Sequence, residues 1–293
     1  MPGNYPSKGK SIRQVSGLGT PDLRGGYGSF TVFTDSNQFA DKNVNGGMIV
    51  KLNFEGKKAQ SALQGPRNTL REDAPYLNVP VTIELDEIAK VVKLTVGKHT
   101  VSLREGEWSQ WLTVDFLAIP IFAKISGIYK VYIKQMSPDI IIYLTPININ
   151  PARPTMPIFS SKRVGEQLVK KIGPFYTQGL PEDTKALSHG IFTDTEYLNH
   201  SYQIIDERKR LLNYELERFK KLEQGFLFFY FPSLDLDSHM FWRTIDKTHP
   251  MYNETLAAKY GNTIQDLYVE FDRIIGKITK TFDMEDPNFS FLV

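Results

Sequence analysis

The two side chains of this sequence whose types and spacing best suit metal chemistry are Asp235 and His239. If a helix begins near Leu236, the two residues lie one turn apart on the same side of it. A carboxylate oxygen and an imidazole nitrogen can then bind one divalent cation, at about 2.0–2.2 Å in a zinc site. A zinc ion takes three or four ligands from the protein, so the spacing predicts half of a metal site.

A purely structural interpretation is also open, because any long helix offers an aspartate and a histidine at this spacing. Asp235 could cap the helix and His239 could lie on its surface. The nearby candidates for further ligands are Asp237, Asp246 and His249. His249 stands in a predicted turn, and Asp237 points away from the site if Asp235 points into it.

The elements around the pair favour the metal interpretation. Residues 226–231 form a continuous apolar run that ends in proline and serine, which predicts a buried strand of a parallel sheet over residues 225–231. Ligands of open α/β sheets bind just beyond the carboxyl ends of such strands. Apolar residues at helical spacing predict further helices over residues 164–172, from a capping box at Thr193 to about residue 219, and over residues 263–282.

The remainder of the chain divides into parts of different periodicity. Residues 1–45 are rich in glycine and turn residues, and residues 46–146 alternate apolar and polar side chains, which predicts short antiparallel strands. Four prolines between residues 146 and 157 mark a boundary. We therefore expect an α/β protein in three parts: a glycine-rich part of an α/β core (1–45), an inserted β-sandwich-like module (46–146), and an α/β core with the metal motif (147–293).

Composition excludes several classes of protein. Lys plus Arg number 35 against 33 Asp plus Glu, a net charge of +2, and a nucleic-acid polymer would demand a more basic surface. Without cysteine there is no disulfide or thiolate site. We expect no transmembrane segment, since no apolar stretch approaches the roughly 20 residues needed. The first ten residues are no secretory signal, which leaves the cytoplasm and the periplasm equally open.

Three stretches together resemble the alkaline phosphatase superfamily, and within it the bacterial type I phosphodiesterase/nucleotide pyrophosphatase-like proteins. They are YFPSLDLDSHMFWR (230–243) with Asp246 and His249 behind it, GLGTPDLRG (17–25) followed by YGSF (27–30), and FYTQGLPEDT (175–184). The resemblance covers residues 1–40 and 150–293, with the β module as an insertion. It implies an alkaline-phosphatase-like sheet with helices, incomplete in this chain.

The resemblance further implies a metal-dependent phosphoester hydrolase. In that family two divalent cations, usually zinc, with manganese as an alternative, clamp a phosphoryl group during in-line displacement. Asp235 and His239 match two ligands of one metal. The nucleophile and one metal-binding aspartate would precede Met1, and a Ser-Asp-His-Gly motif would follow Val293. The expected protein is thus the central part of such an enzyme, with an incomplete site and little or no activity alone.

The expected substrate is a small phosphoester, either a nucleotide or a phosphodiester. Asp22 and Arg24 in the glycine-rich part could approach its phosphate, with Arg24 as a bidentate clamp, or could simply bracket a turn. Gln178 and Glu182 are further candidates, although carboxylates in such a loop more often cap the following turn.

A non-enzymatic function remains an alternative. In that case the β module is a binding module for a glycan, a lipid headgroup or another protein, carried on a vestigial phosphatase scaffold. A transferase with related chemistry and a homo-oligomer are also compatible with the sequence.

Overall fold

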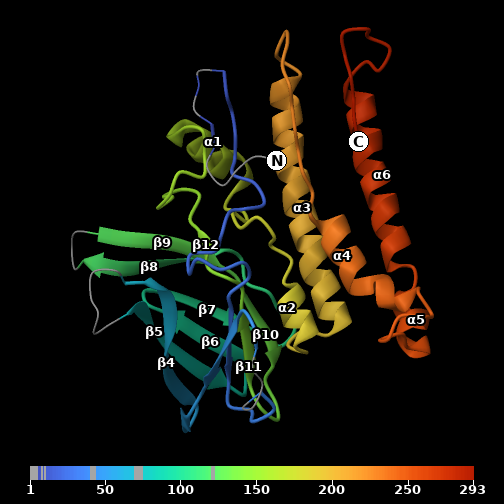
Figure 1. The fold of residues 1–293 in the computed structure, drawn as a ribbon. Coiled ribbons are helices and arrows are strands. Elements are labelled where there is room, and N and C mark those ends of the chain that lie inside the picture. The colour runs from blue at the N-terminus through green and yellow to red at the C-terminus, as the bar shows by residue number, and fades with distance from the viewer. Residues whose placement is uncertain (1–5, 8, 10, 40–43, 69–74, 120–122) are drawn as a thin grey trace. The chain divides into compact units, whose positions relative to one another are not determined.

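Three small sheets and several helices form the described part of the chain, which confirms the expectation of a mixed α/β protein. The computed structural model describes residues 6–7, 9, 11–39, 44–68, 75–119 and 123–293. The chain divides into two compact units, residues 1–191 and 192–293 (Figure 1). All the described strands lie in the first unit, and the second unit contains the helical segments that follow residue 192.

The strands of the first unit form one mixed and two antiparallel sheets. The mixed sheet has the order β10-β11-β1-β2, and its β1 and β2 run parallel. Its strands are β1 (Phe30–Thr34), β2 (Gly47–Lys51), β10 (Val131–Gln135) and β11 (Ile141–Leu144). The five-stranded antiparallel sheet contains, in order, β3 (Phe54–Glu55), β4 (Lys58–Arg67), β5 (Tyr76–Asp86), β6 (Val91–Val96) and β7 (His99–Leu103). The third has the order β12 (Asn148–Ile149), β9 (Ala123–Tyr129) and β8 (Leu112–Ile119).

The alternation in the sequence explains why these residues form strands. In β5, Val79, Val81 and Ile83 are buried while the residues between them face outward, so a single register satisfies the whole strand. Gly97 lies between β6 and β7 with a φ of +57°, a conformation that favours glycine in a tight turn. The predicted period-two strands and this turn are confirmed.

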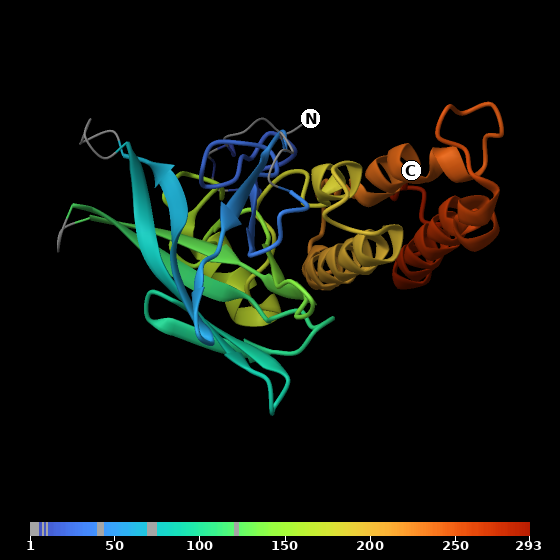
Figure 2. The same cartoon turned by 90° about the horizontal axis from the view of Figure 1, so that it is seen from below.

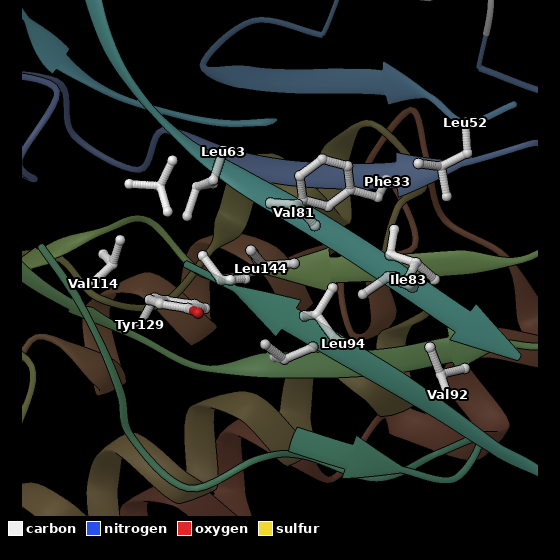
Figure 3. Close-up of a cluster of buried hydrophobic side chains, with 14 of the residues drawn as sticks. Phe33, Leu52, Leu63, Val81, Ile83, Val92, Leu94, Val114, Tyr129 and Leu144 are labelled. Carbon is white, nitrogen blue, oxygen red and sulfur yellow. The ribbon is translucent and has the colours of Figure 1, made fainter. Parts of the chain in front are cut away.

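The core of the first unit draws side chains from all these sheets. Phe33 and Leu144 come from the mixed sheet, Val81 from the five-stranded sheet, and Val114 and Tyr129 from β8 and β9 (Figure 3). Each such side chain contributes about 1.5–3 kcal/mol by leaving water. Because the three sheets share one cluster, they stabilise one another.

Helices follow the last strand. In the first unit they are α1 (Lys162–Ile172) and α2 (Thr184–Ser188). In the second they are α3 (Asp194–Phe219), α4 (Ser233–Phe241), the 3-10 turn η1 (Trp242–Thr244), α5 (Glu254–Tyr260) and α6 (Thr263–Thr281). The Thr193 hydroxyl accepts from the Glu196 backbone NH while the Glu196 carboxylate accepts from the Thr193 NH, so the predicted capping box is confirmed. The three predicted helices correspond to α1, α3 and α6. Within the second unit, α3 and α6 lie side by side in both views (Figures 1 and 2).

The predicted buried strand over residues 225–231 is wrong. The segment is extended but pairs with no strand among the described residues. Leu227, Phe229 and Phe231 pack against the cluster formed by α3 and α6, whereas Phe226 and Phe228 on the other face are 87% and 54% exposed. The apolar period-two pattern thus gives the extended backbone, but a strand also requires a neighbour to accept its hydrogen bonds.

No described helix is long and apolar enough to cross a membrane.

Candidate functional site

Asp235 and His239 lie one turn apart on α4, as their spacing predicts. The Nε2 atom of His239 is 3.5 Å from Oδ1 of Asp235, and the two side chains are 70% and 65% exposed. Asp235 stands in the first turn of α4, where the helix dipole favours a carboxylate. The pair therefore presents an oxygen and a nitrogen donor to solvent at a separation that a single cation can bridge.

Asp237 faces the opposite way, into the interior of the helical unit. It is fully buried, and the Ser201 hydroxyl on α3 donates to its Oδ2 atom at 2.6 Å. Burial raises the pKa of Asp237 to about 6, although the hydrogen bond from Ser201 opposes this rise. Asp235 and Asp237 face opposite directions, as expected. Asp235 faces solvent and Asp237 faces the interior of the second unit. The Ser201–Asp237 contact joins α3 to α4 and so fixes the face that α4 turns to solvent.

The other nearby candidates have local structural roles. The Oδ1 atom of Asp246 accepts from both the backbone NH and the hydroxyl of Thr248, and these hydrogen bonds lower the pKa of Asp246. The His249 ring accepts from the Met251 NH at 3.1 Å. No group of three or more His, Cys, Asp or Glu side chains within the described ranges could hold a metal ion. Within the described residues, Asp235 and His239 therefore have no third such side chain beside them.

The glycine-rich loop (residues 17–28) is organised around the buried carboxylate of Asp22. Its Oδ1 atom accepts from the backbone NH groups of Arg24 and Gly26, and its Oδ2 atom accepts from that of Ser29, at 2.8–3.1 Å. A carboxylate that accepts three backbone hydrogen bonds satisfies NH groups that a helix or a strand would otherwise pair, and so fixes the conformation of the loop. Asp22 thus holds the loop together from inside.

Arg24 is the second organiser of this loop. Its guanidinium donates to the carbonyl oxygens of Ser29 and Gln64 and to the hydroxyl of Thr31, at 2.6–3.0 Å. Burial lowers the pKa of Arg24 to about 10, so it stays charged at neutral pH. The guanidinium thus joins the loop to β1 and β4, and its donors are engaged by these protein oxygens.

The structure brings the glycine-rich loop into contact with residues 178–185, which lie far away in the sequence. The Gly179 NH donates to the Thr20 carbonyl at 3.0 Å, and the Lys185 ammonium donates to the Tyr27 carbonyl at 2.7 Å. Gln178 and Glu182 are both buried in this segment. The Gln178 side chain donates to the Leu180 carbonyl, and its amide oxygen has no hydrogen-bond partner among the described residues. Four sequence-predicted residues thus belong to one assembly of loops, while Asp235 and His239 belong to the other unit.

Asp183 is a buried acid of this same loop, and it caps the following helix, as the sequence predicts for a carboxylate at such a position. Its carboxylate accepts from the Tyr143 hydroxyl at 2.6 Å and from the Ala186 NH at 2.9 Å, where it caps α2. Burial raises the pKa of Asp183 from 3.8 to about 6, against the lowering effect of both hydrogen bonds. Its position before Thr184 indicates a cap, but nothing local in the sequence predicts its pairing with Tyr143 on β11.

We expect Asp183→Asn to alter the pH dependence of stability. The folded state binds this proton more tightly than the unfolded state, so the contribution is present below about pH 4 and is lost as pH rises to about 6. The loss amounts to at most about 3 kcal/mol, at about 1.4 kcal/mol for each pKa unit. Asparagine can keep the cap without ionising. Guanidinium unfolding of both proteins from pH 4 to 7.5 should show the variant gaining stability relative to wild type as pH rises. A constant difference would contradict the assignment.

Comparison with protein-family models, curated proteins and solved structures finds no match to this chain.

Proposed function

We propose that this chain is part of a metal-dependent phosphoester hydrolase of the phosphodiesterase/nucleotide pyrophosphatase type, in which Asp235 and His239 bind one of two divalent cations. The observation that supports this best is the 3.5 Å separation of Oδ1 and Nε2 on the exposed face of α4. The proposed fold is alkaline-phosphatase-like, with the β-rich residues 46–146 as an insertion.

The two donors fit a zinc ion. Oxygen and nitrogen ligands at about 2.0–2.1 Å from a tetrahedral zinc stand about 3.3–3.4 Å apart. The observed 3.5 Å therefore requires almost no side-chain movement. The same distance also suits a plain carboxylate–imidazole ion pair, and cation binding distinguishes the two. When bound, a pair of such cations would stabilise the charge on the phosphoryl oxygens and activate the attacking oxygen.

The chain's own residues have two tasks in this proposal. Asp235 and His239 hold the cation, and Ser201 and Asp237 fix the orientation of α4 from beneath. Imidazole ligates a metal only in its neutral form, so proton competition weakens binding in acid. The proposal requires additional ligands and a nucleophile from protein segments other than the described residues. Its substrate would be a small phosphoester such as a nucleotide.

We expect zinc to bind weakly at this pair. Isothermal titration of the chain with zinc should give a site whose affinity falls at least about tenfold in Asp235→Ala and in His239→Ala. His249→Ala removes an imidazole from the same unit and serves as the matched control, with unchanged affinity expected. An affinity that is equal in all four proteins would contradict a metal site at Asp235 and His239, and so would a complete lack of binding.

Hydrolysis tests the catalytic part of the proposal. Residues 1–293 alone should hydrolyse bis-p-nitrophenyl phosphate at the background rate with zinc or manganese, because two ligands leave the cation incompletely held. In the polypeptide or complex that supplies the missing groups, Asp235→Ala should abolish turnover. Turnover there that survives both Asp235→Ala and His239→Ala would rule out the proposed role.

A further inference from the structure

A cavity of about 600 Å³ lies in the first unit, and none of the candidate site residues discussed so far lines it. It opens between the start of β5, the turn from β6 to β7, and the β8–β9 hairpin. These strands belong to two different sheets, β5, β6 and β7 to one and β8 and β9 to the other. Strands of both sheets therefore contribute to the lining of the cavity. Its volume is in the range of sites for small organic ligands.

Part of the lining of this cavity is apolar. Val79, Val96 and Val114 line it and at the same time belong to the buried core cluster. Leu117 on β8 also lines the cavity and is 54% exposed. A ligand with an alkyl or aryl body would cover Leu117 and the edges of the valines, at about 25 cal/mol for each Å² of apolar surface removed from water.

The lining also carries uncompensated positive charge on two exposed side chains. Lys98 and Lys124 line it, and neither forms a hydrogen bond or an ion pair with a described residue. The one carboxylate in the lining, Asp115, is already paired with Arg153, whose Nη2 atom lies 3.1 Å from Oδ1. Two ammonium groups in the lining therefore have no carboxylate partner among the described residues. Charges of one sign beside a low-dielectric wall attract a ligand of opposite charge.

We propose that this cavity binds a small amphiphilic carboxylate, with its hydrocarbon body against Leu117 and the valines and its carboxylate between Lys98 and Lys124. The apolar side chains select for the hydrocarbon chain and the two ammonium groups select for the anionic end. This site is independent of the metal pair, and it gives the β module a ligand of its own.

Titration calorimetry with decanoate below its micelle concentration tests the proposal. Decanoate should bind saturably, decanol at least about fivefold more weakly because it lacks the charge, and acetate not measurably because it lacks the chain. Lys98→Gln/Lys124→Gln should weaken decanoate binding about tenfold and leave decanol unchanged. Leu117→Ser, at a position that is 54% exposed, should weaken both.

Lys170→Gln/Lys171→Gln on α1 is the matched control, since it removes the same charge from another exposed surface of the unit. It should bind decanoate like wild type. The proposal is overturned if decanoate fails to saturate, if decanol binds as tightly, or if the control loses as much affinity as Lys98→Gln/Lys124→Gln. Binding to anionic lipid vesicles without binding to monomeric decanoate would also overturn it, because the cavity would then be part of a membrane-contact surface.

Discussion

Arg24→Met should destabilise the first unit by about 3–5 kcal/mol, the usual result of removing one partner from a buried charged network. The methionine keeps most of the apolar stem but none of the donors. The carbonyls of Ser29 and Gln64 and the hydroxyl of Thr31 then lose their hydrogen bonds, and the Asp22 carboxylate stays buried without the neighbouring cation. Each buried group left without a partner costs about 1–3 kcal/mol.

Guanidinium unfolding followed by tryptophan fluorescence suits this measurement, because Trp108 and Trp111 report on the first unit. Arg153→Met is the control, since its ion pair with Asp115 lies on the surface and contributes about 1 kcal/mol or less. Arg24→Lys should fall between the two, because it restores the charge without the fork. If Arg24→Met and Arg153→Met were equally stable, the guanidinium would not be the organiser of the loop.

Gly179→Ala should lower the free energy of unfolding by about 3 kcal/mol or more, because its methyl group would overlap the backbone of a neighbouring loop. A Cβ atom at this position would lie 2.0 Å from the carbonyl oxygen of Leu18. No rotamer relieves such a clash, so the two loops must separate and the hydrogen bond from the Gly179 NH to the Thr20 carbonyl must break. The expected result is a large fall in the unfolding midpoint of the first unit.

Gly276→Ala is the matched control for this substitution. Gly276 lies inside α6, and a Cβ atom there would have no neighbour within 4 Å. Alanine should therefore stabilise the helix by up to about 1 kcal/mol. If Gly179→Ala were tolerated as well as Gly276→Ala, the close approach of the glycine-rich loop to residues 178–185 would be in error.

The elements that depend on local sequence are those that can be predicted from it. The alternation of Val79, Val81 and Ile83 specifies β5, and the capping box at Thr193 specifies where α3 begins, because each signal lies within a few residues of its effect. The spacing of Asp235 and His239 likewise needs only the geometry of a helix. These predictions succeed since nothing distant has to be known.

The remaining features depend on partners far away in the chain. Arg24 reaches the carbonyl of Gln64, forty residues later, and Asp183 reaches Tyr143, forty residues earlier. Neither contact leaves a local pattern in the sequence. The segment at 225–231 fails for the same reason: its apolar period indicates an extended backbone correctly, but no pattern within it states whether neighbouring strands exist.

The exposed aromatic side chains of that extended segment also bear on the colloidal behaviour of the protein. Residues 226–231 are uncharged, contain neither glycine nor proline, and are rich in residues that favour strands, which is the signature of aggregation-prone peptides. Lys220, Lys221 and Glu223 precede them and Pro232 follows, in positions where gatekeeper residues oppose cross-β stacking. Aggregation should therefore become faster as protein concentration and ionic strength rise, since salt screens the gatekeeper charges and leaves the aromatic face unchanged.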